Sequence, residues 1–151
     1  MKGLIKTATA EKSEVMIHLE TQSVQEGEAN RLVQDVSGQF FNMGKTIYLR
    51  YQENLNGQKP AIVTFKINAK GEVQLSRHQG KSRSRMFFIV NKRLEAHYQT
   101  PYGELPLTTV TPKMDVSVGE YPLRGKISID YSLYSAGNEL GQYKIRLHFL
   151  G

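Results

Sequence analysis

Strict alternation of apolar and polar residues is the feature that most constrains how this chain can fold. Residues 127–133 place Ile127, Ile129, Tyr131 and Leu133 at every second position, and residues 143–149 repeat the pattern with Tyr143, Ile145, Leu147 and Phe149. Successive side chains of a β-strand point to opposite faces of a sheet, so each segment buries one face only. A helix needs a period of 3.6, so both segments are predicted to be strands.

The same period of two returns in shorter segments along the chain. Turn-forming residues separate them, as in residues 54–57, 68–71 and 136–138. These connections are too short for parallel crossovers, which need a dozen or more residues. We therefore expect eight to ten antiparallel strands joined mostly by hairpins. The further strand segments are residues 15–19, 47–51, 61–67, 73–75, 94–98 and 105–118.

Half-buried strands in this number can form a sandwich or a closed barrel. Short successive hairpins favour the barrel, and closure removes exposed strand edges. The chain of 151 residues has the length of a single domain. The sequence thus predicts an all-β fold over residues 1–151, a single antiparallel up-and-down β-barrel of eight to ten strands. Residues 39–43, Gln-Phe-Phe-Asn-Met, are expected to form a short helix or an apolar lid between two strands.

Composition excludes several classes of protein. Cysteine is absent, which removes disulfides, thiolate zinc sites and cysteine nucleophiles. No apolar run approaches the ~20 residues of a membrane helix, and the first residues lack the ~7–15-residue apolar region of a secretory signal. We expect a cytoplasmic protein with no membrane partner, no metal and no cofactor.

The net charge of +6 comes from one segment of the sequence. Residues 77–93 contain six cations and no acid, and the rest of the chain is neutral. The part that follows Gly80 is expected to be a loop. Lys92 and Arg93 would then lie at the other end of the next strand, ~23 Å away for about seven residues. This basic loop of residues 81–93 is either plainly solvated or a binding site for nucleic acid or an acidic protein. Its cations are Lys81, Arg83, Arg85, Lys92 and Arg93.

Arg77 has the same parity as Val73 and Leu75, so a regular strand directs it into the barrel. A buried guanidinium must be paired or hydrogen-bonded. Two interpretations follow: Arg77 and tyrosine hydroxyls hold a small anionic ligand, or Arg77 lies near the mouth and pairs with a strand-end acid such as Glu53. The candidate ligand-binding residues are Arg77, Tyr51, Tyr98, Tyr102, Tyr131, Met86 and Phe88.

Residues 86–90, Met-Phe-Phe-Ile-Val, are apolar on both faces. One face meets the interior, and the other needs cover. The N-terminal segment, the apolar residues 40–41 or a second copy of the chain could supply it. Monomer and homodimer both remain open.

Catalytic signals are poor. The four histidines are scattered, and the sequence has no nucleophile elbow, phosphate loop, dinucleotide fingerprint or HExxH helix. We expect a binding protein without catalytic residues.

A resemblance to a known family is carried by residues 47–53, 64–67, 71–77, 86–88, 98–103, 127–133 and 137, of which the stretch from Tyr98 to Gly103 is the most specific. The chain resembles the YwiB-like domains of Gram-positive bacteria, a family of unknown function, over nearly its whole length. The resemblance implies a calycin-type, lipocalin-like β-barrel and no catalytic residues. The sequence has no tryptophan and so lacks the Gly-x-Trp signature of lipocalins. The predicted function is binding of a small apolar or anionic ligand inside the barrel; the alternative is an interaction module that uses the basic loop.

Overall fold

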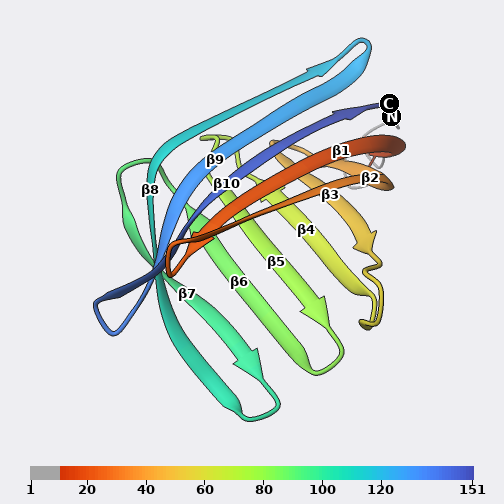
Figure 1. Cartoon of the computed structure of the whole chain (residues 1–151). Helices are drawn as coiled ribbons and strands as arrows, with labels where there is room; N and C mark the ends of the chain where they lie inside the picture. Colours follow the sequence, from red (N-terminus) through yellow and green to blue (C-terminus); the bar gives the residue numbers. More distant parts are fainter. Residues whose placement is uncertain (1–10) are drawn as a thin grey trace.

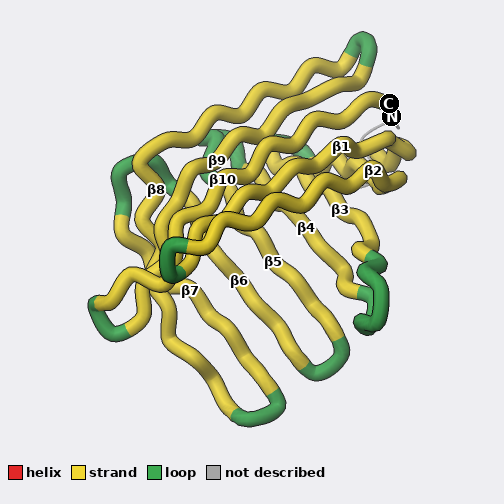
Figure 2. The backbone as a smooth tube through the Cα atoms, viewed as in Figure 1, coloured by secondary structure: helices red, strands yellow, loops and turns green. Residues whose placement is uncertain are grey.

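The computed structural model describes residues 11–151, and strands joined by short turns make up this part of the chain (Figures 1 and 2). No helix occurs within it. The ten strands are β1 (Glu11–Gln25), β2 (Glu28–Met43), β3 (Thr46–Glu53), β4 (Ala61–Ile67), β5 (Val73–Gln79), β6 (Ser82–Phe88), β7 (Arg93–Thr100), β8 (Gly103–Glu120), β9 (Leu123–Ser135) and β10 (Asn138–Leu150).

The strands form a closed antiparallel barrel in which each strand pairs with its neighbours in sequence. Closure comes from β1 and β10, which pair from Met16 with Leu150 to Val24 with Gln142. Every strand therefore has a partner on both sides, as the alternation and the short hairpins predicted. The prediction of an up-and-down barrel of eight to ten strands is confirmed.

Two local predictions were wrong. Residues 39–43 are not a helix or a lid but the end of β2, where Phe40 is buried in the core. Residues 82–85 are not part of a loop but the first half of strand β6, so that only Gly80 and Lys81 separate this strand from β5. In both places the segment is a strand because its backbone pairs with that of a neighbouring strand, β3 in the first case and β5 in the second.

Large inward side chains fill one end of the barrel. This is the end with the β2–β3, β4–β5, β6–β7 and β8–β9 turns, of which the β8–β9 hairpin lies at the top of Figure 1. The rings of Phe40 and Phe149 lie 5.6 Å apart there, and Phe65 and Phe88 are fully buried. Gly125 pairs with Phe149, and a Cβ atom at position 125 would come within 2.3 Å of the Phe149 ring. The glycine thus makes room for the ring that closes this end.

The boundary between β6 and β7 is only partly paired. The register joins Arg83 with Gln99, Ser84 with Tyr98 and Arg85 with His97, and beyond these pairs the strands separate. Thr109 of β8 fills the gap: its buried Oγ1 donates a hydrogen bond to the Phe87 carbonyl at 2.8 Å and lies 3.5 Å from the Leu94 carbonyl. One hydroxyl therefore connects strands whose own ladder is interrupted.

Replacing Thr109 with valine is expected to lower the free energy of unfolding by about 1–3 kcal/mol, because it leaves the part-buried Phe87 carbonyl without its donor while keeping the side-chain shape. Urea denaturation measures the change. Thr108→Val on the same strand is the control and should change stability by no more than about 0.5 kcal/mol. Equal stability of the two variants would show that the Thr109 hydroxyl does not hold the boundary.

Candidate functional site

A cavity of about 290 Å³ occupies the other end of the barrel interior, where the β1–β2, β3–β4, β5–β6, β7–β8 and β9–β10 hairpins lie. The inward side chains of Thr21, Ser23 and Ser84 are small here, which leaves the space open. Most of the wall is apolar. Its apolar residues include Leu19, Val63, Phe65, Leu75, Met86 and Ile145.

An ion pair between Arg77 and Glu53 is the main polar feature of this wall. Arg77 Nη2 donates to Glu53 Oε1, and Gln34 Nε2 donates to Glu53 Oε2 at 3.1 Å. Arg77 Nη1 also donates to Gln79 Oε1 at 3.1 Å. Glu53, the last residue of β3, is only 8% exposed. The interpretation that Arg77 pairs with Glu53 is confirmed, and the two charges cancel inside the cavity.

Two tyrosines add hydroxyl groups to the same cavity. Burial raises the pKa of Tyr51, and the nearby Glu53 carboxylate raises it further. Burial also raises the pKa of Tyr131, with a contribution from Tyr143, whose ring stacks on it at 4.9 Å. Both phenols are therefore neutral donors. Neither hydroxyl forms a side-chain hydrogen bond with any residue between 11 and 151, whereas Tyr143 Oη accepts one from Gln25 Nε2 at 2.6 Å.

The structure brings together four of the seven predicted ligand-binding residues. Arg77, Tyr51, Tyr131 and Met86 all line the cavity. Phe88 is fully buried beneath it, with its ring 4.7 Å from that of Tyr131, and belongs to the core.

The structure does not bring the other two tyrosines to the cavity. Tyr98 is 38% exposed on β7, and Tyr102, at the tip of the β7–β8 hairpin, is 99% exposed. Gln34 also lines the cavity and was not predicted as a site residue, because no strand was predicted at this position of β2. The available signal was its position two residues before the half-buried Val36, which places both side chains on the same face of the strand.

A second hollow, of about 500 Å³, lies on the outer face of β5–β7. Arg83 and Arg85 border it from strand β6, which corrects their predicted place on a loop. His97 Nδ1 lies 3.3 Å from Glu104 Oε1 at its edge. Of the other predicted cations, Lys81 is in the β5–β6 turn, and Lys92 and Arg93 are at the opposite end, as expected. The Arg93 guanidinium lies 5.2 Å from the Tyr134 ring.

The described residues contain no group of three side chains placed to hold a metal ion. They also contain no helix with the length and hydropathy needed to cross a membrane.

Comparisons with known proteins match the chain to one family and one fold. A family model described as "Domain of unknown function (DUF1934)" matches residues 17–147. The crystal structure of the ywiB protein from Bacillus subtilis is similar, with a TM-score of 0.80, 21% sequence identity and coverage of 99% of each chain. No curated protein matches the sequence. The structural similarity supports the barrel fold.

Proposed function

Because this chain belongs to the DUF1934 family, whose domain has no known function, we propose its function from the barrel itself: it binds a small, mainly apolar ligand that carries an uncharged polar end group. The observation that carries this proposal is an apolar cavity with a neutralised ion pair and two unengaged phenols in its wall. Closed barrels of about eight strands hold either packed side chains or one small ligand, as lipocalins do. The calycin-like assignment implied by the sequence resemblance agrees with this role.

The size and lining of the cavity support a small ligand. Its volume of about 290 Å³ is just below the range of ~300–1,000 Å³ typical of ligand pockets. Such pockets combine an apolar wall, which supplies most of the affinity, with a few polar groups that orient the ligand. Here the hydroxyls of Tyr51 and Tyr131 are the orienting groups.

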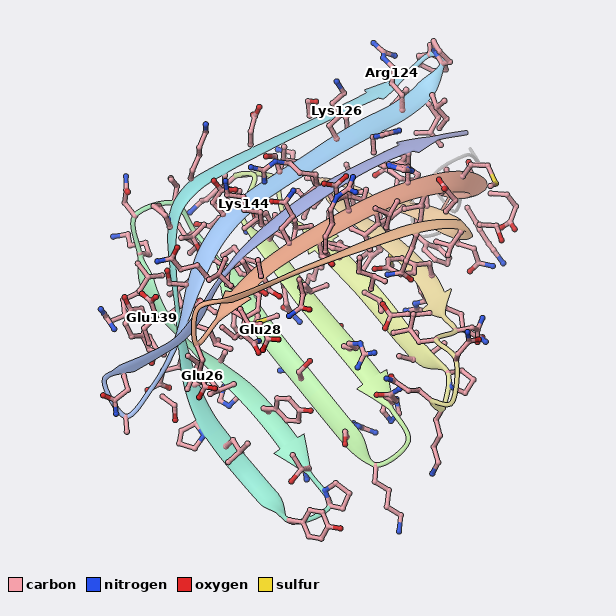
Figure 3. The ribbon with its side chains drawn as sticks, in the orientation of Figure 1. Glu26, Glu28, Arg124, Lys126, Glu139 and Lys144 are labelled. Carbon is pink, nitrogen blue, oxygen red and sulfur yellow. The ribbon has the colours of Figure 1, made fainter. Side chains whose placement is uncertain are left out.

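The charges favour an uncharged end group over an anion. Glu53 already neutralises Arg77, so an anionic ligand would meet a buried carboxylate beside the guanidinium. Three further glutamates lie on the hairpins at the same end of the barrel. Figure 3 shows Glu26 and Glu28 at the β1–β2 hairpin and Glu139 at the β9–β10 hairpin. Lys144 also borders the cavity, so the Glu53 carboxylate inside the cavity, and not the rim, is what disfavours an anion.

Calorimetric titration with octanol, octanoate and octane tests the proposal. We expect octanol to bind more tightly than either of the others, because only octanol combines an apolar chain with a neutral hydroxyl. Ser84→Phe should weaken octanol binding at least ~10-fold, about 1.4 kcal/mol, because the ring fills the cavity. Tyr51→Phe should weaken octanol binding by about 0.5–1.5 kcal/mol and leave octane binding unchanged.

The matched control is Ser117→Phe, which places the same ring on the exposed side of β8. It should bind octanol as the unmodified protein does. If the unmodified protein does not bind octanol, or if Ser84→Phe binds it equally well, the cavity is not a ligand site. Tighter binding of octanoate than of octanol would restore the anionic alternative.

A further inference from the structure

The outward side of four consecutive strands carries cations and no acid. Inward residues on β3–β6 alternate with outward ones, and the register aligns the outward positions in rows across the strands. We call this surface the β3–β6 face. Its outward residues are Tyr48, Arg50, Gln52, Ile62, Thr64, Lys66, Gln74, Ser76, His78, Arg83, Arg85 and Phe87.

The four fully charged side chains of this face have no acidic partner. No carboxylate of residues 11–151 lies within salt-bridge distance of them, whereas Arg31 pairs with Glu20 and Arg146 with Asp130 elsewhere on the barrel. Arg83 and Arg85 are two residues apart on β6, which spaces their Cα atoms by ~7 Å. Arg50 lies three strands from Arg85, ~14 Å across the sheet. The cations are therefore distributed over the face and are not gathered at one position.

Aromatic rings lie among these cations. Phe41 of β2 pairs with Tyr48 of β3, and Phe87 lies on β6; all three are half-buried on the outward side. The Arg50 guanidinium is 5.7 Å from the centre of the Phe41 ring, and Lys66 Nζ is 5.8 Å from that of Tyr48. Rings that these flexible side chains can reach from the surface can also be reached by a flat base.

We propose that the β3–β6 face binds single-stranded nucleic acid. Arg50, Arg83 and Arg85 contact phosphates, and bases stack on Tyr48 and Phe87. Cations that follow the backbone and aromatic rings that stack on bases are the two elements of single-strand binding. The bases of a duplex are not free to stack on side chains, so the aromatic rings favour a single strand. The hollow of about 500 Å³ beside Arg83 and Arg85 gives a nucleotide room at the β7 side of this surface, where Glu104 borders it on the far side from the two arginines.

The side chains that contact nucleic acid in this proposal are not those of the cavity wall. The hollow and the cavity meet at Arg77 and Ser84, which border both. Arg83 and Arg85 point outward, whereas Met86 points into the cavity. The nucleic-acid proposal therefore does not depend on the ligand in the barrel.

Fluorescence anisotropy with a labelled single-stranded oligothymidylate, measured over a range of salt concentrations, tests the proposal. The unmodified protein should bind at low salt. Arg83→Gln combined with Arg85→Gln should weaken binding ~10-fold and reduce the slope of log K against log salt by about 1.4, because each phosphate contact on a single strand contributes about 0.7. Phe87→Leu should weaken binding about fivefold, the low end of the effect of one stacked base, with no change in slope.

The control is Lys113→Gln combined with Lys126→Gln, which removes the same charge from β8 and β9 (Figure 3 shows Lys126). It should leave both the affinity and the slope unchanged. Equal weakening by this control would show that only the net charge matters, and the proposal would fail. It would also fail if the oligothymidylate did not bind at low salt, if a duplex bound equally tightly, or if polyglutamate displaced the oligonucleotide as well as an unlabelled single strand does.

Discussion

Truncation of Phe149 to alanine is expected to lower the free energy of unfolding by about 3–5 kcal/mol, the usual cost of removing a buried phenylalanine side chain. Phe149 is 1% exposed and packs against Phe40 at the filled end of the barrel. It also lies on β10, which pairs with β1 to close the barrel. Because strands surround the position, neighbouring side chains cannot collapse fully into the space. Urea denaturation followed by circular dichroism measures the loss.

Leu150→Ala is the matched control, because the next side chain points outward and is 56% exposed. It should change stability by no more than about 0.5 kcal/mol. A second substitution tests the contact with Gly125. Gly125→Ala should destabilise the unmodified protein by about 1–3 kcal/mol through overpacking and should cost much less once Phe149 is alanine. If the two effects simply add, the ring does not depend on the space left by the glycine.

Replacing Arg77 with leucine is expected to lower the free energy of unfolding by about 3 kcal/mol at neutral pH. The substitution leaves the Glu53 carboxylate buried with only Gln34 as a partner, and breaking a buried ion pair costs ~3–5 kcal/mol. We expect the low end of this range because 35% of the Arg77 side chain is exposed to solvent.

The double variant Arg77→Leu/Glu53→Leu separates the cost of a stranded charge from the value of the pair. Replacement of a whole buried pair by apolar residues is often neutral or stabilising. The double variant should therefore recover most of the stability lost in Arg77→Leu. If it is no more stable than the single variant, Arg77 stabilises the barrel through packing of its aliphatic portion and not through Glu53.

The sequence predicted those parts of the barrel where an apolar face meets a packed interior. β9 and β10 alternate clearly because their inward residues, such as Ile129 and Leu147, are fully buried. The first half of β2 could not be found in this way. Residues 28–33 are exposed on both faces because the β1–β2 hairpin extends beyond the end of β3. Without a buried face, a strand has no hydrophobic period.

The part of the cavity wall that β6 forms could not be predicted from the sequence. Residues 82–85 read Ser-Arg-Ser-Arg, which does have a period of two, but the two inward residues are serines and not large apolar residues. Ser84 borders open space, so no large apolar side chain marks that position as inward. The Arg77–Glu53 pair could be predicted because both residues keep the inward parity of apolar neighbours. The volume beside them depends on which inward side chains are small, and this becomes clear only when all ten strands are in register.

The interrupted ladder between β6 and β7 makes this boundary the part of the barrel wall that is easiest to open. Elsewhere, separation of two strands breaks a long row of backbone hydrogen bonds, but here three residue pairs and the Thr109 hydroxyl hold the boundary. Regions with few backbone hydrogen bonds open at lower free energy than the rest of a domain. We therefore expect β6 and β7 to separate locally at a lower free energy than other neighbouring strands, while the pairing between β1 and β10 stays intact. Since β6 contributes Ser84 and Met86 to the cavity, this local separation would widen the cavity without unfolding the barrel.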